Sequence, residues 1–420
     1  MEEWKEYKLE EILAEKGYIR GPFGSALKRG DMKSSGIPVY EQQHAIYQSR
    51  DFRFFIDDNK FNEMKRFQVQ ENDILISCSG TVGKVTIISK DDPKGIISQA
   101  LLTLRVNPKL ILPEYLKYFF TSQKGYNAII SRSSGSVQVN IAKRDVIEQI
   151  PINLPPLPIQ QKIVEILSSL DDKIELNNKI NKNLEQQAQA LFKSWFVDFE
   201  PFGGKMPEGW KEGQLSDVAE YFNGYPFGSK ELLDSPSDEC YDVFKQGHIK
   251  KGGGFNSDGT KSWYPISKCE KLQNYILKKG DILMAMTDMK GNVAILGNTA
   301  IMPVDNKYIV NQRVGLLRAK KDMGVDYPYL YLLTNEHTFL MDLRSRANSG
   351  VQVNLSSSAI KESEINIATK KDYEDFNQIV KPLFETMLQN QLENKQLATI
   401  RDTLLPKLMN GEIDVDSVQI

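Results

Sequence analysis

The sequence predicts an α+β protein in which two duplicated α/β domains are separated by two long antiparallel helices. Apolar residues keep a heptad phase across residues 153–199, and this pattern is typical of a long helix that pairs with another helix as a coiled coil. Short motifs of residues 1–152 return in residues 200–370, and a second long helical pattern follows in 371–420. The chain therefore alternates domain, helix, domain and helix, and we expect its two halves to be related by a pseudo-two-fold axis.

The composition is that of an ordinary soluble protein. The chain has 420 residues, of which 40% are hydrophobic and 26% charged, and this length suffices for two or three domains. No apolar run reaches the 18 or so residues that a membrane span needs, and the acidic start Met-Glu-Glu-Trp-Lys-Glu is unlike a signal peptide. The three cysteines are scattered and odd in number, which argues against a disulfide framework. We predict a cytoplasmic protein that does not contact membranes.

The first domain reads as short strands followed by a helix. Runs rich in β-branched residues and bounded by turn residues predict strands at Ile37–Gln42, Asp73–Ser77, Lys84–Ser89 and Leu101–Val106. Pro113 stands where a helix over residues 114–122 would begin, a position that proline favours.

The first long helix is expected from about Pro158 to Phe196, roughly 58 Å at 1.5 Å per residue. Its apolar seam lacks two members, Asn177 and Asn181, which would cost stability and set the register with a partner helix. An amphipathic helix of this kind could also simply be part of a core. The second pattern, residues 376–412, favours helix pairing, although Thr386, Asn390 and Glu393 interrupt its seam.

An internal duplication follows the Gly/Pro-rich linker 200–210. The equivalent motifs are Trp4-Lys5-Glu6 and Trp210-Lys211-Glu212, Pro22-Phe23-Gly24-Ser25 and Pro226-Phe227-Gly228-Ser229, Asp73-Ile74-Leu75 and Asp281-Ile282-Leu283, and Val-Gln-Val-Asn at 137–140 and 351–354. The offset between copies drifts from 204 (227 minus 23) to 214 (351 minus 137), as insertions in one copy would cause. A shared scaffold with divergent loops suits two binding sites of the same kind that recognise different ligands.

The net charge of −2 does not indicate nucleic-acid binding, but one segment is basic. Between Phe244 and Lys279 there are eight lysines against Asp258 and Glu270, together with three consecutive glycines. Such a segment could follow a phosphate backbone or form a solvated loop.

Catalytic motifs do not stand out. The stretch Ser-Gly-Thr-Val-Gly-Lys-Val-Thr at 79–86 lacks the spacing and the hydroxyl of a nucleotide-binding loop. Asn153-Leu154-Pro155-Pro156 departs from the tetrapeptide of amino-methyltransferases, and His44, His248 and His337 have no metal-ligand spacing.

The chain resembles the specificity subunit of type I restriction-modification systems over nearly its whole length. The likeness is carried by Leu-Pro-Pro-Leu-Pro-Ile-Gln-Gln-Lys at 154–162, Leu-Phe-Lys-Ser-Trp-Phe-Val-Asp-Phe at 191–199, Arg-Asp-Thr-Leu-Leu-Pro-Lys-Leu-Met-Asn-Gly-Glu-Ile at 401–413 and the duplicated motifs. The resemblance implies two target-recognition domains, each reading half of a bipartite double-stranded DNA target, and no enzymatic activity in this chain. It also implies docking of two modification (methyltransferase) subunits and optionally of a restriction motor subunit. Those partners would carry S-adenosylmethionine, ATP and magnesium, and this chain would hold no cofactor.

The divergent loops of the two copies predict an asymmetric target. Two alternatives stay open at this point: a coiled-coil scaffold that binds only proteins, and an enzyme whose active site is not evident from its motifs.

Polar loop residues at equivalent positions of the two copies are the candidates for DNA contact. In the first copy they are Ser25, Lys28, Gln42, His44, Ser79, Thr81, Lys84, Gln138 and Asn140. In the second copy they are Ser229, Lys230, Gln246, His248, Lys250, Lys251, Thr287, Lys290, Gln352 and Asn354. The repeated motifs among them could instead be turn scaffolding.

Large apolar residues near the helix ends are the candidates for partner docking. They are Leu191, Phe192, Trp195, Phe196, Leu404, Leu405 and Leu408. Part of this surface must also pack against the two domains.

Overall fold

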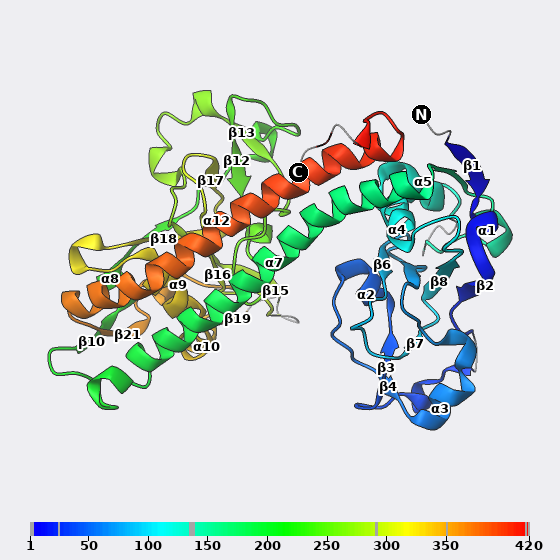
Figure 1. The fold of residues 1–420 in the computed structure, drawn as a ribbon. Coiled ribbons are helices and arrows are strands. Elements are labelled where there is room, and N and C mark those ends of the chain that lie inside the picture. The colour runs from blue at the N-terminus through cyan, green and yellow to red at the C-terminus, as the bar shows by residue number, and fades with distance from the viewer. Residues whose placement is uncertain are drawn as a thin grey trace. The chain divides into compact units, whose positions relative to one another are not determined.

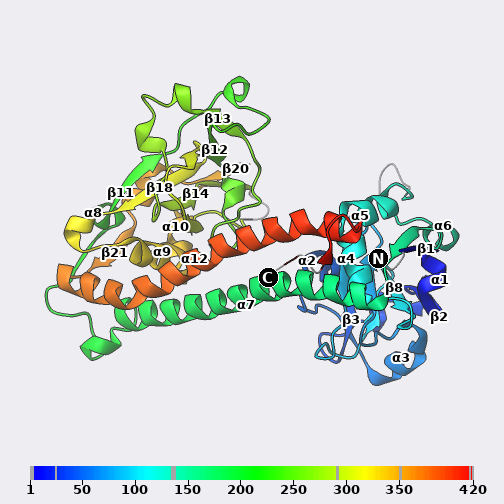
Figure 2. The same ribbon diagram turned by 45° about the horizontal axis from the view of Figure 1, so that its top comes forward.

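The computed structural model describes residues 4–23, 26–133, 139–289, 293–349, 352–415 and 418. The chain divides into two compact units, one formed by Met1–Ile174 with Gln396–Ile420 and the other by Glu175–Lys395. Two long helices, α7 (Leu157–Phe196) and α12 (Lys370–Met409), each contribute one part to both units (Figures 1 and 2). Within the described residues, none of the helices has the length and apolar character that a membrane crossing requires.

The first unit is built on a four-stranded antiparallel sheet with the order β2-β8-β5-β6. Its strands are β2 (Leu13–Arg20), β8 (Leu101–Val106), β5 (Ile74–Ser77) and β6 (Val85–Ile87). A second sheet has the order β4-β3-β7, with β4 (Phe55–Ile56), β3 (Ile37–Tyr40) and β7 (Ile96–Ile97), and β1 (Lys5–Lys8) pairs with β9 (Pro151–Leu154). The helices are α1 (Leu9–Ile12), α2 (Gln42–Tyr47), α3 (Asp58–Glu63), α4 (Pro113–Thr121), α5 (Gln123–Ile130) and α6 (Arg144–Ile147). The predicted strands and the helix that begins at Pro113 are confirmed, except that the first predicted strand ends at Tyr40 and Gln42 begins α2.

The second unit repeats this topology. Its four-stranded sheet has the order β11-β18-β14-β16, with β11 (Ala219–Asn223), β18 (Val314–Ala319), β14 (Ile282–Ala285) and β16 (Thr299–Ile301). The smaller sheet has the order β13-β12-β17, with β13 (Trp263–Pro265), β12 (Cys240–Phe244) and β17 (Tyr308–Val310), and β10 (Lys211–Gln214) pairs with β21 (Glu364–Ile367). An additional sheet has the order β15-β20-β19, with β15 (Thr287–Met289), β20 (Gln352–Asn354) and β19 (Asn348–Ser349). The helices are α8 (Leu215–Val218), α9 (Tyr327–Asn335), α10 (His337–Ser345) and α11 (Ser357–Lys361).

The strand register shows which residues of the two copies are equivalent. In the first unit Ile76 lies opposite Val85, and in the second Met284 lies opposite Thr299. Because Ile76 and Met284 occupy the same place in the repeated Asp-Ile-Leu strand, Val85 and Thr299 are equivalent as well. The predicted internal duplication is therefore present in the fold, strand by strand.

Each unit buries the apolar face of those parts of α7 and α12 that belong to it. In the first unit Ile163 and Leu167 of α7 and Leu405 and Leu408 of α12 lie in one apolar cluster with the sheet. In the second unit the aromatic residues Phe192, Phe196, Phe376 and Phe384 occupy the corresponding cluster. A helix of this length is stabilised mainly by such packing of its apolar face, so the heptad pattern serves the two domain cores as well as any helix pairing.

The two helices contact each other through asparagines in the second unit. Asn177 is 1% exposed, and its Nδ2 donates to Glu393 Oε2 at 2.7 Å and to Asn394 Oδ1 at 2.9 Å. Asn390 Nδ2 donates to Asn181 Oδ1 at 2.8 Å. Asn177 of α7 contacts Glu393 of α12, and Asn181, further along α7, contacts the earlier residue Asn390. The two helix segments therefore run antiparallel within this unit. Asn390 and Glu393, two of the three polar interruptions of the second seam, thus face those of the first. Thr386 is exposed and donates to the Pro382 backbone oxygen of its own helix.

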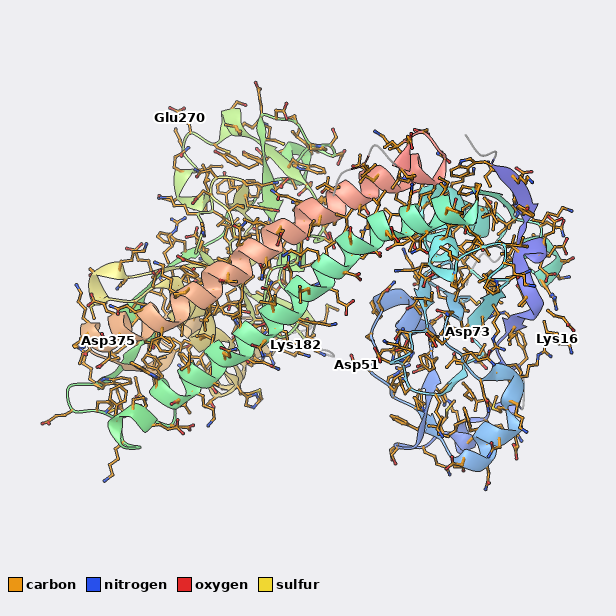
Figure 3. All side chains as sticks on the ribbon, viewed as in Figure 1. Lys16, Asp51, Asp73, Lys182, Glu270 and Asp375 are labelled. Carbon is orange, nitrogen blue, oxygen red and sulfur yellow. The ribbon has the colours of Figure 1, made fainter. Side chains whose placement is uncertain are left out.

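A buried ion pair recurs in the two units. Arg105 donates from Nε to Asp73 Oδ1 at 2.7 Å and from Nη2 to Asp73 Oδ2 at 3.0 Å. Arg318 holds Asp281 in the same way, at 2.9 and 3.0 Å. The aspartate side chains are 1% and 6% exposed, and Figure 3 labels Asp73 inside the first unit. Burial raises the pKa of Asp73, while Arg105 acts against this shift.

We expect Arg105→Ala to destabilise the first unit by about 3–5 kcal/mol, because it leaves the Asp73 carboxylate buried and unpaired. Arg318→Ala should do the same to the second unit through Asp281. Urea unfolding followed by limited proteolysis would report which unit opens first in each variant. Arg29→Ala, at an exposed position of the first unit, is the control, and an equal loss in this variant would contradict the prediction.

Candidate nucleic-acid interface

Asn140 and Asn354, the last residues of the repeated Val-Gln-Val-Asn motif, pair with the residues that follow the central strand in both copies. In the first, Ser79 pairs with Asn140 in an antiparallel bridge, and Ser79 Oγ lies 2.8 Å from Asn140 Oδ1. In the second, Thr287 of β15 pairs with Asn354 of β20. The structure thus brings together residues that are 61 and 67 positions apart (140 minus 79, 354 minus 287) in the sequence. Three other candidates, Ser25, Gln138 and Lys290, lie outside the described residues.

Gln246 joins the pair in the second copy. Its Nε2 donates to the Thr287 backbone oxygen, and Thr287 Oγ1 donates to Gln246 Oε1 at 2.6 Å. Asn354 Nδ2 also donates to the backbone oxygen of Gln352 at 3.2 Å. In the first copy the equivalent Gln42 begins α2, and its buried Oε1 finds no hydrogen-bond partner among the described residues. The second copy therefore holds a closed polar cluster where the first has an unused acceptor.

The turn after β5 presents two candidates to solvent. Ser77 Oγ donates to the Thr81 backbone oxygen at 2.6 Å and accepts from Lys84 N at 2.9 Å. The side chains of Thr81 and Lys84 are exposed, and Lys84 Nζ lies 5.0 Å from the centroid of the Tyr126 ring. The aromatic face attracts the ammonium group and so holds the Lys84 side chain near this turn.

Lys28, Ser229 and Lys230 lie on exposed turns that are built alike. The backbone N–H of Lys28 donates to Asp31 Oδ2 at 2.8 Å, and that of Gly228 donates to Glu231 Oε2 at 3.0 Å. An acidic side chain thus closes each turn and leaves the preceding lysine or serine side chains in solvent.

The two histidines are part of the interior. His44 is 0% and His248 3% exposed. Each Nδ1 accepts a backbone N–H three residues earlier, from Glu41 at 2.7 Å and from Lys245 at 3.0 Å. Their rings pack against Phe52 and against Phe244, respectively. In this structure the imidazoles support the turn from inside and do not reach the surface.

The basic segment of the second copy begins with an ordered turn. Lys250 N donates to Gly254 O, and Gly254 N donates to Thr299 O, both at 2.9 Å. Gly253 has φ of +101°, and a Cβ there would come within 2.8 Å of Asn335 Oδ1, so glycine is required where the turn meets α9. Lys250 and Lys251 are exposed.

The structure places the candidate docking residues in the chain's own cores. Phe192 and Phe196 are 4% and 7% exposed, while Leu191 and Trp195 pack on the same cluster of the second unit. In the first unit Leu405 and Leu408 are 5% and 0% exposed, and Leu404 packs beside them. Phe192, Phe196, Leu405 and Leu408 are thus used in packing against the domains. Leu191, Trp195 and Leu404 stay partly exposed, and partner docking through them remains a prediction.

Tyr47 is a surface residue that the pattern of polar loops does not identify. It ends α2 and is 75% exposed. An aromatic residue after Ala45 and Ile46 looks like a core residue in the sequence. Its alignment with Lys251 at the offset of 204 (251 minus 47) is the one signal that could have singled it out.

Within the described ranges, no three His, Cys, Asp or Glu side chains gather as metal ligands would.

Comparison with known proteins shows similarity along the whole chain. The family model for the type I restriction modification DNA specificity domain matches residues 1–186 and 207–401. The HindI type I restriction enzyme specificity subunit of Haemophilus influenzae is 26% identical, over 98% of this chain and 100% of the relative. The MjaIX specificity subunit of Methanocaldococcus jannaschii is also 26% identical, over 83% of this chain and 81% of the relative. The crystal structure of a type I restriction-modification S subunit from M. genitalium has a TM-score of 0.61 at 16% identity and covers 97% of this chain and 96% of that chain.

We expect acid to destabilise the protein through the two buried histidines. Burial lowers the pKa of both imidazoles below the usual 6.5. Below about pH 6.5 the unfolded chain therefore binds more protons at these histidines than the folded chain does, and the free energy of unfolding falls as the pH drops. Above about pH 6.5 both states hold neutral imidazoles, and these groups have no effect on stability. Urea unfolding at about pH 7.5 and about pH 5.5 should show this loss. The double variant His44→Gln plus His248→Gln should lose less stability between the two pH values, and an unchanged difference would assign the acid sensitivity to other groups.

Proposed function

The chain belongs to the type I restriction-modification DNA specificity family, and on this premise we propose that it is the DNA-recognition subunit of a type I complex in the cytoplasm. It is a specificity subunit, and catalysis belongs to other subunits of such systems. The observation that carries the proposal is the family match to both copies, residues 1–186 and 207–401. Two copies of a recognition domain in one chain suit a DNA target that consists of two separate parts.

We propose that each domain reads one half of a bipartite target. The equivalent pairs Ser79–Asn140 and Thr287–Asn354 support this proposal, because each holds a segment two residues beyond the end of the equivalent strands β5 and β14. The surrounding residues differ: Gln246 closes a cluster on Thr287, while Gln42 leaves an acceptor unused. Since base edges are distinguished by their pattern of donors and acceptors, different clusters would read different half-sites, and the target would be asymmetric.

In this proposal α7 and α12 pair as an antiparallel coiled coil around a pseudo-two-fold axis and set the distance between the half-sites. The antiparallel contacts of Asn177 and Asn181 with α12 support it. A buried amide left without a partner costs about 1–3 kcal/mol, so these asparagines favour one register over a slipped one.

The partners would be two modification (methyltransferase) subunits docked on the helices and optionally a restriction motor subunit. These subunits would bring S-adenosylmethionine, ATP and magnesium. A scaffold that binds only proteins through its helices is the alternative, and it would show no salt-dependent duplex binding.

We expect the modification subunits, assembled with this chain and S-adenosylmethionine, to methylate bases within one asymmetric two-part sequence. Sequencing of methylated genomic DNA would give both half-sites and the gap. Binding of the assembled complex to duplexes that carry this sequence should weaken steeply with salt, since phosphate contacts release counterions. Assembly without duplex binding would favour the protein scaffold.

Lengthening both helices by one heptad should widen the gap and leave the half-sites unchanged. Seven residues add about 10 Å, near the rise of about three base pairs. One insertion follows Asn181, and the other precedes Asn390, because these residues face each other. Methylation mapping is the measurement. A fixed gap with altered half-sites would mean that loops of the domains, and not the helices, set the spacing.

A further inference from the structure

The segment that follows the buried histidine is anchored at the same point in both copies. In the first unit Gln48 Nε2 donates to the backbone oxygen of Val85 at 3.0 Å. In the second, Gly254 N donates to the backbone oxygen of Thr299 at 2.9 Å. Val85 and Thr299 are equivalent by strand register. Two unrelated loops therefore end on one equivalent carbonyl, next to the candidate interface.

In the first copy this loop presents an aromatic ring. Tyr47 is 75% exposed and immediately precedes Gln48, which has a left-handed φ of 56°. Arg50 holds this loop in place from its other side, because its guanidinium donates to the Asp92 carboxylate at 2.6 and 2.9 Å. The backbone that carries the ring is thus held in place, and Lys84, the neighbour of Val85, lies beside the same anchor.

In the second copy the equivalent loop presents positive charge. Lys251 stands at the offset that aligns His44 with His248 (248 minus 44 is 204, and 251 minus 47 is 204). Lys250 and Lys251 are exposed at the start of the turn that is pinned on Thr299. The sequence offset thus aligns the neutral aromatic Tyr47 with Lys251, and Lys250 immediately precedes Lys251.

We propose that this position contacts the duplex in both domains, through Tyr47 against base edges in one half-site and through Lys250 and Lys251 against phosphates in the other. The inference rests on the proposed function. A tyrosine ring offers an apolar face that suits the methyl group of thymine in the major groove, whereas lysines neutralise phosphates without regard to sequence. One domain would thus gain sequence discrimination at this point, and the other would gain affinity.

The test compares two variants of the chain in the assembled complex, using a duplex with the mapped target and an unrelated duplex. Tyr47→Ala should weaken binding to the target about tenfold and leave the unrelated duplex and the salt dependence unchanged. Lys250→Ala plus Lys251→Ala should weaken binding to both duplexes and reduce the slope of log affinity against log salt by up to about two.

Three controls separate the possible causes. Tyr47→Phe keeps the ring and should bind as the unaltered chain does, and thermal unfolding checks that each variant is folded. Lys268→Ala plus Lys271→Ala removes two exposed lysines elsewhere in the basic segment and should change the slope of log affinity against log salt less.

Target binding by Tyr47→Ala equal to that of the unaltered chain, or an equal loss on both duplexes, would overturn the inference. Absence of duplex binding by the unaltered complex would instead overturn the proposed function.

Discussion

The buried pairing of one aspartate with one arginine is the constraint on which each domain depends. Asp73 immediately precedes β5 and Arg105 lies on β8, and Asp281, which immediately precedes β14, pairs with Arg318 of β18 in the same geometry. A buried carboxylate tolerates little displacement from its guanidinium partner, because unpaired burial of either charge is costly. The two central strands are thereby held in one register, and the polar groups that follow the first of them are held with it. Loops that leave these strands can change without loss of the scaffold.

The long helices depend on a different balance. Their ends are covered by the domain cores, with Phe196 and Phe376 in one unit and Leu167 and Leu408 in the other. Between these apolar stretches, Asn177 and Asn181 bond with Asn390 and other polar groups of α12. Asparagines at such positions reduce stability but select one register. For a subunit whose helices would measure a distance on DNA, a single register is worth more than additional stability.

The equivalent positions of the two copies divide into those that are the same and those that differ. The histidines are the same, and both are buried supports of a turn. The Ser79–Asn140 and Thr287–Asn354 pairs are alike as well and hold a segment against the central strand. Tyr47 and Lys251 differ in chemistry although they share an anchor. Residues kept in both copies thus build the scaffold, and the residues that differ are those that would distinguish the two proposed half-sites.

The sequence by itself determined the duplication, the strands of the first domain and the long helix from Pro158 to Phe196, because these depend on local periodicity and on motifs that repeat. It could not show that His44 and His248 are interior, since a polar residue in a loop motif looks the same whether it faces solvent or caps a backbone amide. Nor could it show that Phe192 and Phe196 belong to the core and Tyr47 to the surface. Burial is decided by what lies across the fold from a side chain, and only the tertiary structure brings Tyr329 and Phe376 onto α7 and leaves Tyr47 uncovered.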